Sequence, residues 1–206
     1  MTDRVRVRAE TVLAARRFPL REIEFDYRRK DGRWQTQRYE VYGCGDAVAI
    51  LPYDPTRGMV LLARQFRLAA FLNGGSVSLV EACAGMLAGR DPESRVRDEA
   101  EEELGCRVTG VHKLFTAFAS PGVSTERITY FVAEYRSSDR VSAGGGLVNE
   151  GEDIEVLELP LDNALDMIGR GEIIDAKTII LLQHVKLHGL GEAFRSGSTG
   201  AGNTEA

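Results

Sequence analysis

The chain has 206 residues, of which 43% are hydrophobic, and a formal net charge of -5. This length and composition can bury one well-packed domain with a small appendage, and the acidic balance argues against a general nucleic-acid-binding protein. No stretch has the apolar length of a signal peptide or of a membrane span, so we expect neither. Three widely spaced cysteines, Cys44, Cys83 and Cys106, form no even framework and indicate a reducing, cytoplasmic setting.

Alternating residue types predict several strands in chain order. Residues 21–42 alternate around a Lys-Asp-Gly turn at residues 30–32, which is typical of a hairpin. Residues 46–66 predict a second hairpin, because Pro55 and Gly58 stand where a turn favours them. Further strands are expected over residues 77–85, 106–118, 126–135 and 153–159.

Helices are fewer in this sequence. Asp91 can cap a helix that has Pro92 in its first position and that ends at Gly105. A short helix is expected over residues 161–169, and a longer one over residues 176–188, where Gly189 stops it. The order of strands, one helix, strands and then helices predicts an α+β fold, in which helices pack on the faces of a mixed sheet.

The first of these helices is unusually acidic. Residues 98–103 contain five carboxylates in six positions. On a helical wheel, Glu103 lies only about 20° from Val96, which begins the apolar stripe, and Glu99 lies about 60° away on the same edge. Glu102 lies beside Glu99, whereas the other two acids point toward solvent. Two carboxylates of this helix therefore border its buried face.

Buried neighbouring carboxylates are costly. Two charges about 6 Å apart repel by roughly 3 kcal/mol at an effective dielectric of 20, and burial adds a desolvation cost. A divalent cation offsets both costs, and ligands that are oxygen only favour Mg²⁺ or Mn²⁺ over zinc. Judged on charge alone, a solvated acidic face is the commoner explanation of such a run.

The context of the helix resembles the Nudix box, Gly-x5-Glu-x7-Arg-Glu-U-x-Glu-Glu-x-Gly-U, where U is apolar. The second half of the box is matched by Glu99, Ala100, Glu102, Glu103, Gly105 and, in the last apolar place, Cys106. The first half departs from the pattern, because the loop after Gly85 is one residue too short and Asp91 stands nearest the loop acid. Asp98 takes the place of the arginine that orients a helix glutamate, which leaves Arg95 or Arg97 for that role.

From about residue 25 to residue 187, the chain is similar to the GDP-mannose pyrophosphatase branch of the Nudix hydrolases, close to the ADP-ribose pyrophosphatases. The segments that carry this resemblance are RKDG, EVY, ARQFR, NGG, EACAG, SPG, AEY, AGGG, EDIEVLELP, GEI and KTIILL. The resemblance implies a Nudix α/β/α sandwich over residues 43–194. It also implies antiparallel strands over residues 1–42 that are exchanged in a homodimer and help to bind the base. The small polar residues at 195–206 are expected to be disordered.

The resemblance also implies a site. Metal ligands would be the Ala84 carbonyl, Glu99 and Glu103, joined by Glu102 and Glu152; the catalytic acids would be Glu152 as general base with Glu102 and Glu103. Glu152 follows three glycines at residues 144–146, which we expect to form a mobile loop; an ordinary acidic surface loop is the alternative. Substrate contacts are implied at Arg17, Arg38, Tyr39, Glu40, Arg67, Ala84, Gly85, Met86, Glu103, Glu126, Glu152 and Lys177.

The implied activity is Mg²⁺-dependent hydrolysis of the pyrophosphate bond of a nucleotide sugar, with Mn²⁺ as an alternative ion. GDP-mannose, cut to GMP and mannose 1-phosphate, is the first choice because Lys177 matches a position characteristic of that branch. Tyr39 stands where the branch usually has a basic residue, which weakens the assignment of the base. The alternatives are ADP-ribose or another nucleotide sugar as substrate, a Nudix-fold sensor that binds such a ligand without cutting it, and an acidic interaction domain.

Overall fold

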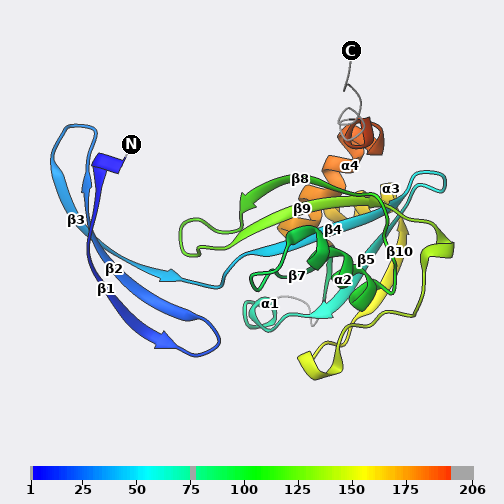
Figure 1. Cartoon of the computed structure of the whole chain (residues 1–206), viewed down its shortest axis with the longest axis horizontal. Coiled ribbons are helices and arrows are strands. Elements are labelled where there is room, and N and C mark those ends of the chain that lie inside the picture. Colours follow the sequence, from blue (N-terminus) through cyan, green and yellow to red (C-terminus); the bar gives the residue numbers. More distant parts are fainter. Residues whose placement is uncertain (1, 75–77, 196–206) are drawn as a thin grey trace, which may run out of the picture. The chain divides into compact units, whose positions relative to one another are not determined.

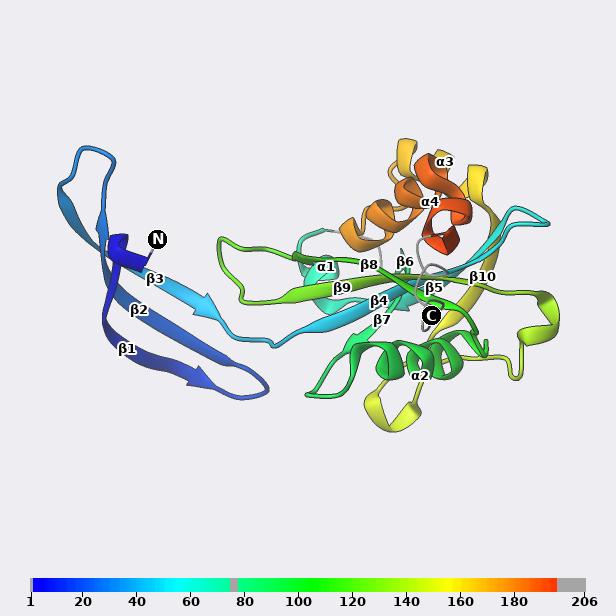
Figure 2. The ribbon, with the colours of Figure 1, turned by 45° about the horizontal axis from the view of Figure 1, so that its top comes forward.

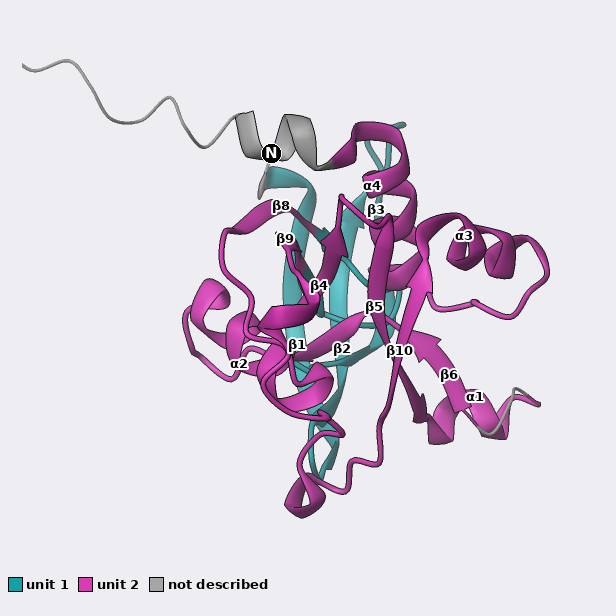
Figure 3. Ribbon diagram, turned by 90° about the vertical axis from the view of Figure 1, so that its right-hand side faces the viewer, with its two compact units in different colours: residues 1–46, 117–128 teal, residues 47–116, 129–206 magenta. Residues whose placement is uncertain are grey.

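The computed structural model describes residues 2–74 and 78–195, and the chain divides into two compact units (Figure 3). One unit contains residues 1–46 and 117–128, and the other contains residues 47–116 and 129–206. The tail expected to be disordered lies outside the described residues except for Arg195.

The first unit is built on a three-stranded antiparallel sheet (Figure 1), which follows a 3-10 helix, η1 (Thr2–Arg4). Its strands are β1 (Val5–Ala15), β2 (Pro19–Arg28) and β3 (Trp34–Tyr42), paired in that order. The turn between β2 and β3 has Gly32 at a positive φ, so the hairpin predicted from the Lys-Asp-Gly turn is confirmed. Every residue of β1 is exposed to solvent, so this strand buries no core of its own.

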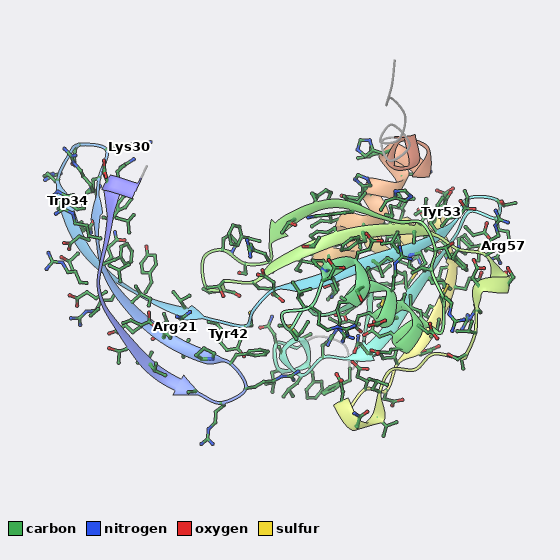
Figure 4. All side chains as sticks on the ribbon, viewed as in Figure 1. Arg21, Lys30, Trp34, Tyr42, Tyr53 and Arg57 are labelled. Atoms are coloured by element: carbon green, nitrogen blue, oxygen red, sulfur yellow. The ribbon has the colours of Figure 1, made fainter. Side chains whose placement is uncertain are left out.

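The second sheet has seven strands in the order β10-β5-β4-β9-β8, with β6 paired to β5 and β7 paired to β4. The strands are β4 (Ala47–Asp54), β5 (Met59–Phe66), β6 (Ser78–Glu81), β7 (Cys83–Met86), β8 (Val111–Phe118), β9 (Arg127–Glu134) and β10 (Glu155–Pro160). The predicted hairpin of residues 46–66 is confirmed as β4 and β5. Figure 4 marks Tyr53 on β4 and Arg57 in its turn, where the Arg57 guanidinium donates to Asp54 and Glu158, each at 2.6 Å.

Helices cover both faces of the second sheet (Figure 2). The helix α2 (Pro92–Leu104) packs on β7, β4 and β5, while α3 (Leu161–Gly169) and α4 (Ala176–Arg195) lie on the opposite face. The remaining helices are α1 (Leu68–Leu72), η2 (Ser137–Asp139) and η3 (Val148–Glu150). The predicted α+β fold with a mixed sheet between helices is therefore confirmed.

The predicted capping of α2 is confirmed in detail. The Asp91 carboxylate accepts from the Ser94 N–H at 2.9 Å, Pro92 is the first helical residue, and Gly105 ends the helix in the left-handed region. The predicted apolar stripe, Val96, Ala100 and Leu104, is fully buried against the sheet. The sequence therefore determines which face of α2 is turned inward.

Other predicted boundaries were wrong. The strand expected over residues 77–85 breaks at Ala82, whose N–H donates to the Thr178 hydroxyl on α4 at 2.6 Å instead of to a neighbouring strand. Strand β8 begins at Val111 and not at Cys106, because the Cys106 N–H is still bonded to Ala100 O at the end of α2. The helix α1 was missed: none of its residues is buried, so it has no apolar stripe to recognise.

The last helix continues past the stop that was predicted for it. Gly189 has non-helical φ and ψ of 58° and −175°, as expected of a stop, but helix resumes beyond it as far as Arg195. Within the described residues, no helix combines the length and apolar character needed to cross a bilayer.

Candidate active site

Two carboxylates of α2 point toward strand β7. In the folded chain, the relative exposures of Glu99 and Glu103 are 3% and 1%. Burial and then the charge of Glu103 raise the pKa of Glu99 to about 8. Burial also raises the pKa of Glu103 to about 7, although hydrogen bonds from Cys83 and the Ala84 N–H act in the opposite direction. Ionising both groups therefore requires a compensating cation.

Strand β7 supplies the backbone against which both carboxylates lie. The Ala84 N–H donates to Glu103 Oε2 at 3.2 Å. A Cβ on Gly85 would lie 1.5 Å from Glu99 Oε1, so only glycine allows that carboxylate to approach the strand. The structure thus brings together four of the predicted site residues, Ala84, Gly85, Glu99 and Glu103.

A buried arginine lies among these acids. The Arg95 guanidinium donates from Nε to Met86 O at 3.2 Å and from Nη1 to Glu102 Oε2 at 3.3 Å, and its Nη2 pairs with Glu99 Oε1. Only 14% of the Arg95 side chain is exposed. Of the two arginines considered from the sequence, Arg95 contacts helix glutamates of the site, whereas Arg97 pairs with Glu93 at 2.7 Å.

The residue at the usual arginine position of the box is turned away from the site. Asp98 forms an ion pair with Arg90 at the surface. Glu101 likewise pairs with Arg107 at 2.8 Å, and its side chain is 44% exposed. The five carboxylates of residues 98–103 therefore divide into two surface ion pairs and three acids that face β7 and Arg95.

The glycine loop is docked on the end of α2. The Gly145 N–H donates to Glu103 O at 2.9 Å, and the Gly146 N–H donates to Glu102 O at 3.1 Å. A Cβ on Gly144 would lie 2.4 Å from Glu103 O, so the close approach requires glycine. The glycines thus permit backbone packing and satisfy carbonyls at the end of the helix, while the mobility expected of this loop stays a prediction.

This docking brings Glu152 to the acidic site. Its Oε2 accepts from the Leu147 N–H at 2.8 Å, and a Cβ on Gly146 would lie 2.5 Å from the same oxygen. The charge of Glu152 contributes to the raised pKa of both Glu99 and Glu103, which places the three carboxylates in one electrostatic environment. Glu152 is therefore near the acidic cluster, and its role in the site stays a prediction.

A second charged cluster surrounds Glu81, the last residue of β6. Arg67 donates from Nη2 and Nε to Glu81 Oε2 at 2.7 and 2.9 Å. Lys177 Nζ lies 3.4 Å from Glu81 Oε1 and 2.9 Å from the Asp175 carboxylate. Glu81 is only 3% exposed, and Gln65 Nε2 also donates to it, at 3.3 Å. Two of the four cations that the sequence predicts in substrate binding, Arg67 and Lys177, are thus held by one buried carboxylate.

Sequence reasoning missed Glu81 and left Arg95 undecided. Glu81 is the only acid in the apolar stretch VSLVEACAG, and a buried acid needs a charged partner, so its position was a usable signal. Arg95 precedes Glu99 by four residues, a spacing at which opposite charges on a helix meet. The partners of Glu81, however, lie 14 and 96 residues away along the chain.

The remaining predicted substrate residues belong to the smaller unit. Arg38 pairs with Glu24 at 2.6 Å, and the Tyr39 ring lies edge-on to Phe25. The predicted substrate residues in the smaller unit number five in all: Arg17, Arg38, Tyr39, Glu40 and Glu126. Their part in substrate binding stays a prediction.

The donors of the acidic cluster suit a hard divalent cation in kind. Glu99, Glu102, Glu103 and Glu152 offer only oxygen, and two of these groups are buried with raised pKa values. Within residues 2–74 and 78–195, however, no three His, Cys, Asp or Glu side chains are gathered as a metal site. In this arrangement Glu99 and Glu102 pair with Arg95, and the Glu152 carboxylate accepts from the Leu147 N–H.

Comparisons with known proteins show which sequences this chain is similar to. Residues 4–42 match the family model of the GDP-mannose pyrophosphatase NudK N-terminal domain. The chain is 46% identical over 187 residues to a GDP-mannose pyrophosphatase of Escherichia coli (strain SMS-3-5 / SECEC), covering 90% of this chain and 97% of that protein. It is 45% identical over 188 residues to the GDP-mannose pyrophosphatase of Shigella flexneri, covering 91% and 97%.

A solved structure shares the fold. It is described as the crystal structure of an ADP compounds hydrolase, with a TM-score of 0.71 and 16% sequence identity, and the match covers 92% of this chain and 96% of that one. Fold and site together define a Nudix pyrophosphohydrolase. The chain belongs to the GDP-mannose pyrophosphatase branch of the Nudix hydrolases.

Proposed function

We propose that this enzyme hydrolyses the pyrophosphate bond of GDP-mannose and releases GMP and mannose 1-phosphate. The observation that carries this proposal is the pair of buried carboxylates, Glu99 and Glu103, against the end of β7. Sequence identity of 45% and 46% to proteins named GDP-mannose pyrophosphatase, over about nine tenths of the chain, supports the choice of substrate.

We assign Mg²⁺, with Mn²⁺ as an alternative, to the acidic cluster. Its ligands would be the Ala84 carbonyl, Glu99 and Glu103, with Glu102 and Glu152 as further donors. When bound, such an ion neutralises phosphate charge and lowers the pKa of a bound water. The buried carboxylates support this assignment, because a nearby divalent cation favours their ionised forms and offsets the desolvation and repulsion that raise their pKa values.

Glu152 is our choice for the general base. The docked glycine loop holds its backbone beside α2, and the Leu147 N–H orients its carboxylate. A carboxylate that accepts one backbone hydrogen bond keeps further lone pairs with which it can take a proton from water. Glu102 and Glu103 complete the proposed catalytic group.

Arg67 and Lys177 would hold the diphosphate. Arg67 is 42% exposed although its guanidinium is fixed on Glu81, so part of its fork remains accessible to a ligand. A guanidinium in a fixed orientation suits bidentate contact with phosphate oxygens. Gly85 and Met86, at the end of β7, would contact the same part of the substrate.

We further propose that base and sugar are bound with help from Arg17, Arg38, Tyr39, Glu40 and Glu126, and that the enzyme is a cytoplasmic homodimer that exchanges its amino-terminal strands. The exposed apolar side chains of β1, including Val7 at 66% exposure, support a partner for this sheet. The three buried, free cysteines are consistent with a reducing compartment. Light scattering on the purified full chain tests the dimer.

Product analysis on a panel of nucleotide sugars with Mg²⁺ tests the substrate. We expect GMP and mannose 1-phosphate in equal amounts from GDP-mannose, with kcat/KM well above that for ADP-ribose. A higher kcat/KM for ADP-ribose would transfer the assignment to that substrate. Binding of GDP-mannose without turnover at saturating Mg²⁺ would instead indicate a sensor.

A further inference from the structure

Arg95 is a buried cation inside a site that needs a cation. All three guanidinium nitrogens are engaged: Nε with Met86 O, Nη1 with Glu102, and Nη2 with Glu99. This fork connects the end of β7 to two successive turns of α2. A side chain that is 14% exposed and bound at three points is a built part of the site.

The partners of Arg95 are the same carboxylates that the proposed metal site requires. Glu99 and Glu102 each face Arg95, whereas Glu103 is bonded to the Ala84 N–H and lies outside its reach. An arginine keeps its charge at all accessible pH values, so it repels a divalent ion placed on the same oxygens. Arg95 therefore competes with a metal ion for the negative charge of Glu99, whose Oε1 it engages.

We propose that Arg95 is an internal counter-ion that stands in for the metal: it holds Glu99 and Glu102 in the metal-free enzyme and releases them when a divalent ion binds. This inference rests on the metal site of the proposed function. Release leaves the Arg95 guanidinium beside Met86, one of the residues assigned to the substrate. Metal binding thereby converts Arg95 from a partner of carboxylates into a cation available to a phosphate group.

The direct test is Mn²⁺ affinity, measured by calorimetric titration of MnCl2 into chelator-stripped full-length protein. In Arg95→Gln, the competing cation is absent, and we expect the dissociation constant for Mn²⁺ to fall by about ten-fold. The matched control is Arg107→Gln, which removes the same charge from a surface pair with Glu101 and should leave the affinity unchanged.

Thermal unfolding gives a second readout that does not depend on turnover. Without metal, Arg95→Gln should melt at a lower temperature than the wild type, because buried acids lose their counter-ion. With saturating Mn²⁺, most of that difference should disappear, because a ligand stabilises in proportion to its affinity for the folded state. Arg95→Lys serves as a second variant in case Arg95→Gln does not fold without metal. It keeps the positive charge but not the three-point contact of the guanidinium, so its dissociation constant for Mn²⁺ should lie between those of the wild type and Arg95→Gln.

The outcomes separate this inference from the function on which it rests. Unchanged Mn²⁺ affinity in Arg95→Gln would show that Arg95 does not compete, and weaker affinity would show that it orients Glu99 for the metal; either result overturns the exchange. Failure of the wild type to bind Mn²⁺ at all would overturn the metal site itself. If the released Arg95 guanidinium contacts a phosphate group of the substrate, KM for GDP-mannose should rise in Arg95→Gln even at saturating Mn²⁺.

Discussion

Two charge clusters of the larger unit differ in how their charges are balanced: one has more acids than cations, and in the other two cations, Arg67 and Lys177, are paired with two carboxylates, Glu81 and Asp175. Around α2, the single cation Arg95 lies among carboxylates, and two of these, Glu99 and Glu103, have raised pKa values. Around β6, the carboxylate Glu81 lies between two cations, Arg67 and Lys177. The acidic cluster remains short of positive charge and must obtain it from outside, whereas the basic cluster is already paired. The first can therefore recruit a metal ion, and the second presents a preassembled pair of cations.

Glu103→Gln should produce the largest effect, because it removes a charge from the acidic cluster. We expect turnover with Mg²⁺ to fall by about a thousand-fold, as for loss of a group that acts directly on the reacting phosphate. The amide keeps the hydrogen-bonding shape, so circular dichroism should report an intact fold. Glu101→Gln, in a surface pair on the same helix, is the control and should retain activity. Equal activity in the two variants would exclude Glu103 from the site.

Gly85→Ala tests whether closeness of α2 to β7 matters for the acidic cluster. The added Cβ would lie 1.5 Å from Glu99 Oε1, and the atom that must move is the end of a flexible side chain. The fold should persist while Mg²⁺ affinity falls by about a hundred-fold, because a displaced ligand loses its geometry. A titration of activity against Mg²⁺ measures this change. Gly169→Ala, where a Cβ meets nothing within 4 Å, should behave as wild type.

Glu81→Gln tests the basic cluster. Arg67 and Lys177 would lose the carboxylate that fixes them, so we expect KM for GDP-mannose to rise by about ten-fold with a smaller change in kcat. Steady-state kinetics separate the two parameters. Glu155→Gln removes an exposed partner of Arg64 and serves as the control. A fall in kcat at constant KM would place Glu81 in the chemical step and erase the distinction between the clusters.

The last prediction concerns how the free energy of unfolding depends on pH. In metal-free protein, the folded-state pKa values of Glu99 and Glu103, about 8 and about 7, exceed the unfolded value of 4.5. The folded chain binds more protons, so the stabilisation is complete below pH 4.5 and is lost as pH rises through 7 and 8. We expect the free energy of unfolding to decrease between pH 5 and pH 8, measured by urea unfolding in chelator.

Saturating Mg²⁺ should reduce this loss, because the ion favours the ionised carboxylates and binds more tightly as pH rises. A metal-free protein whose stability increases from pH 5 to pH 8 would contradict the buried-acid description. In Glu103→Gln the slope should be smaller than in the wild type, because one of the two titrating groups is absent.

Local chemistry in the sequence determined much of this molecule. Caps at Asp91 and Gly105 determine where α2 begins and ends, and the 3.6-residue period determines that Val96, Ala100 and Leu104 face the core, with Glu99 and Glu103 on the same side. Turn residues likewise determined both hairpins. These features depend on neighbours within a few residues, so a pattern along the chain is sufficient to identify them.

Only the tertiary structure decided how the charges are partnered. Glu81 meets Arg67 across a strand pair and Lys177 from a helix 96 residues later, and the glycines at 144–146 are explained by backbone contact with α2. The position of Arg95 depends on β7, which places the Met86 carbonyl oxygen within hydrogen-bond distance of its guanidinium. Electrostatic pairing depends on distance in space and on burial, and neither is encoded in any short stretch of sequence. The acids of the acidic cluster could therefore be located from the sequence, whereas the choice between Arg95 and Arg97 and the partners of Glu81 required the tertiary structure.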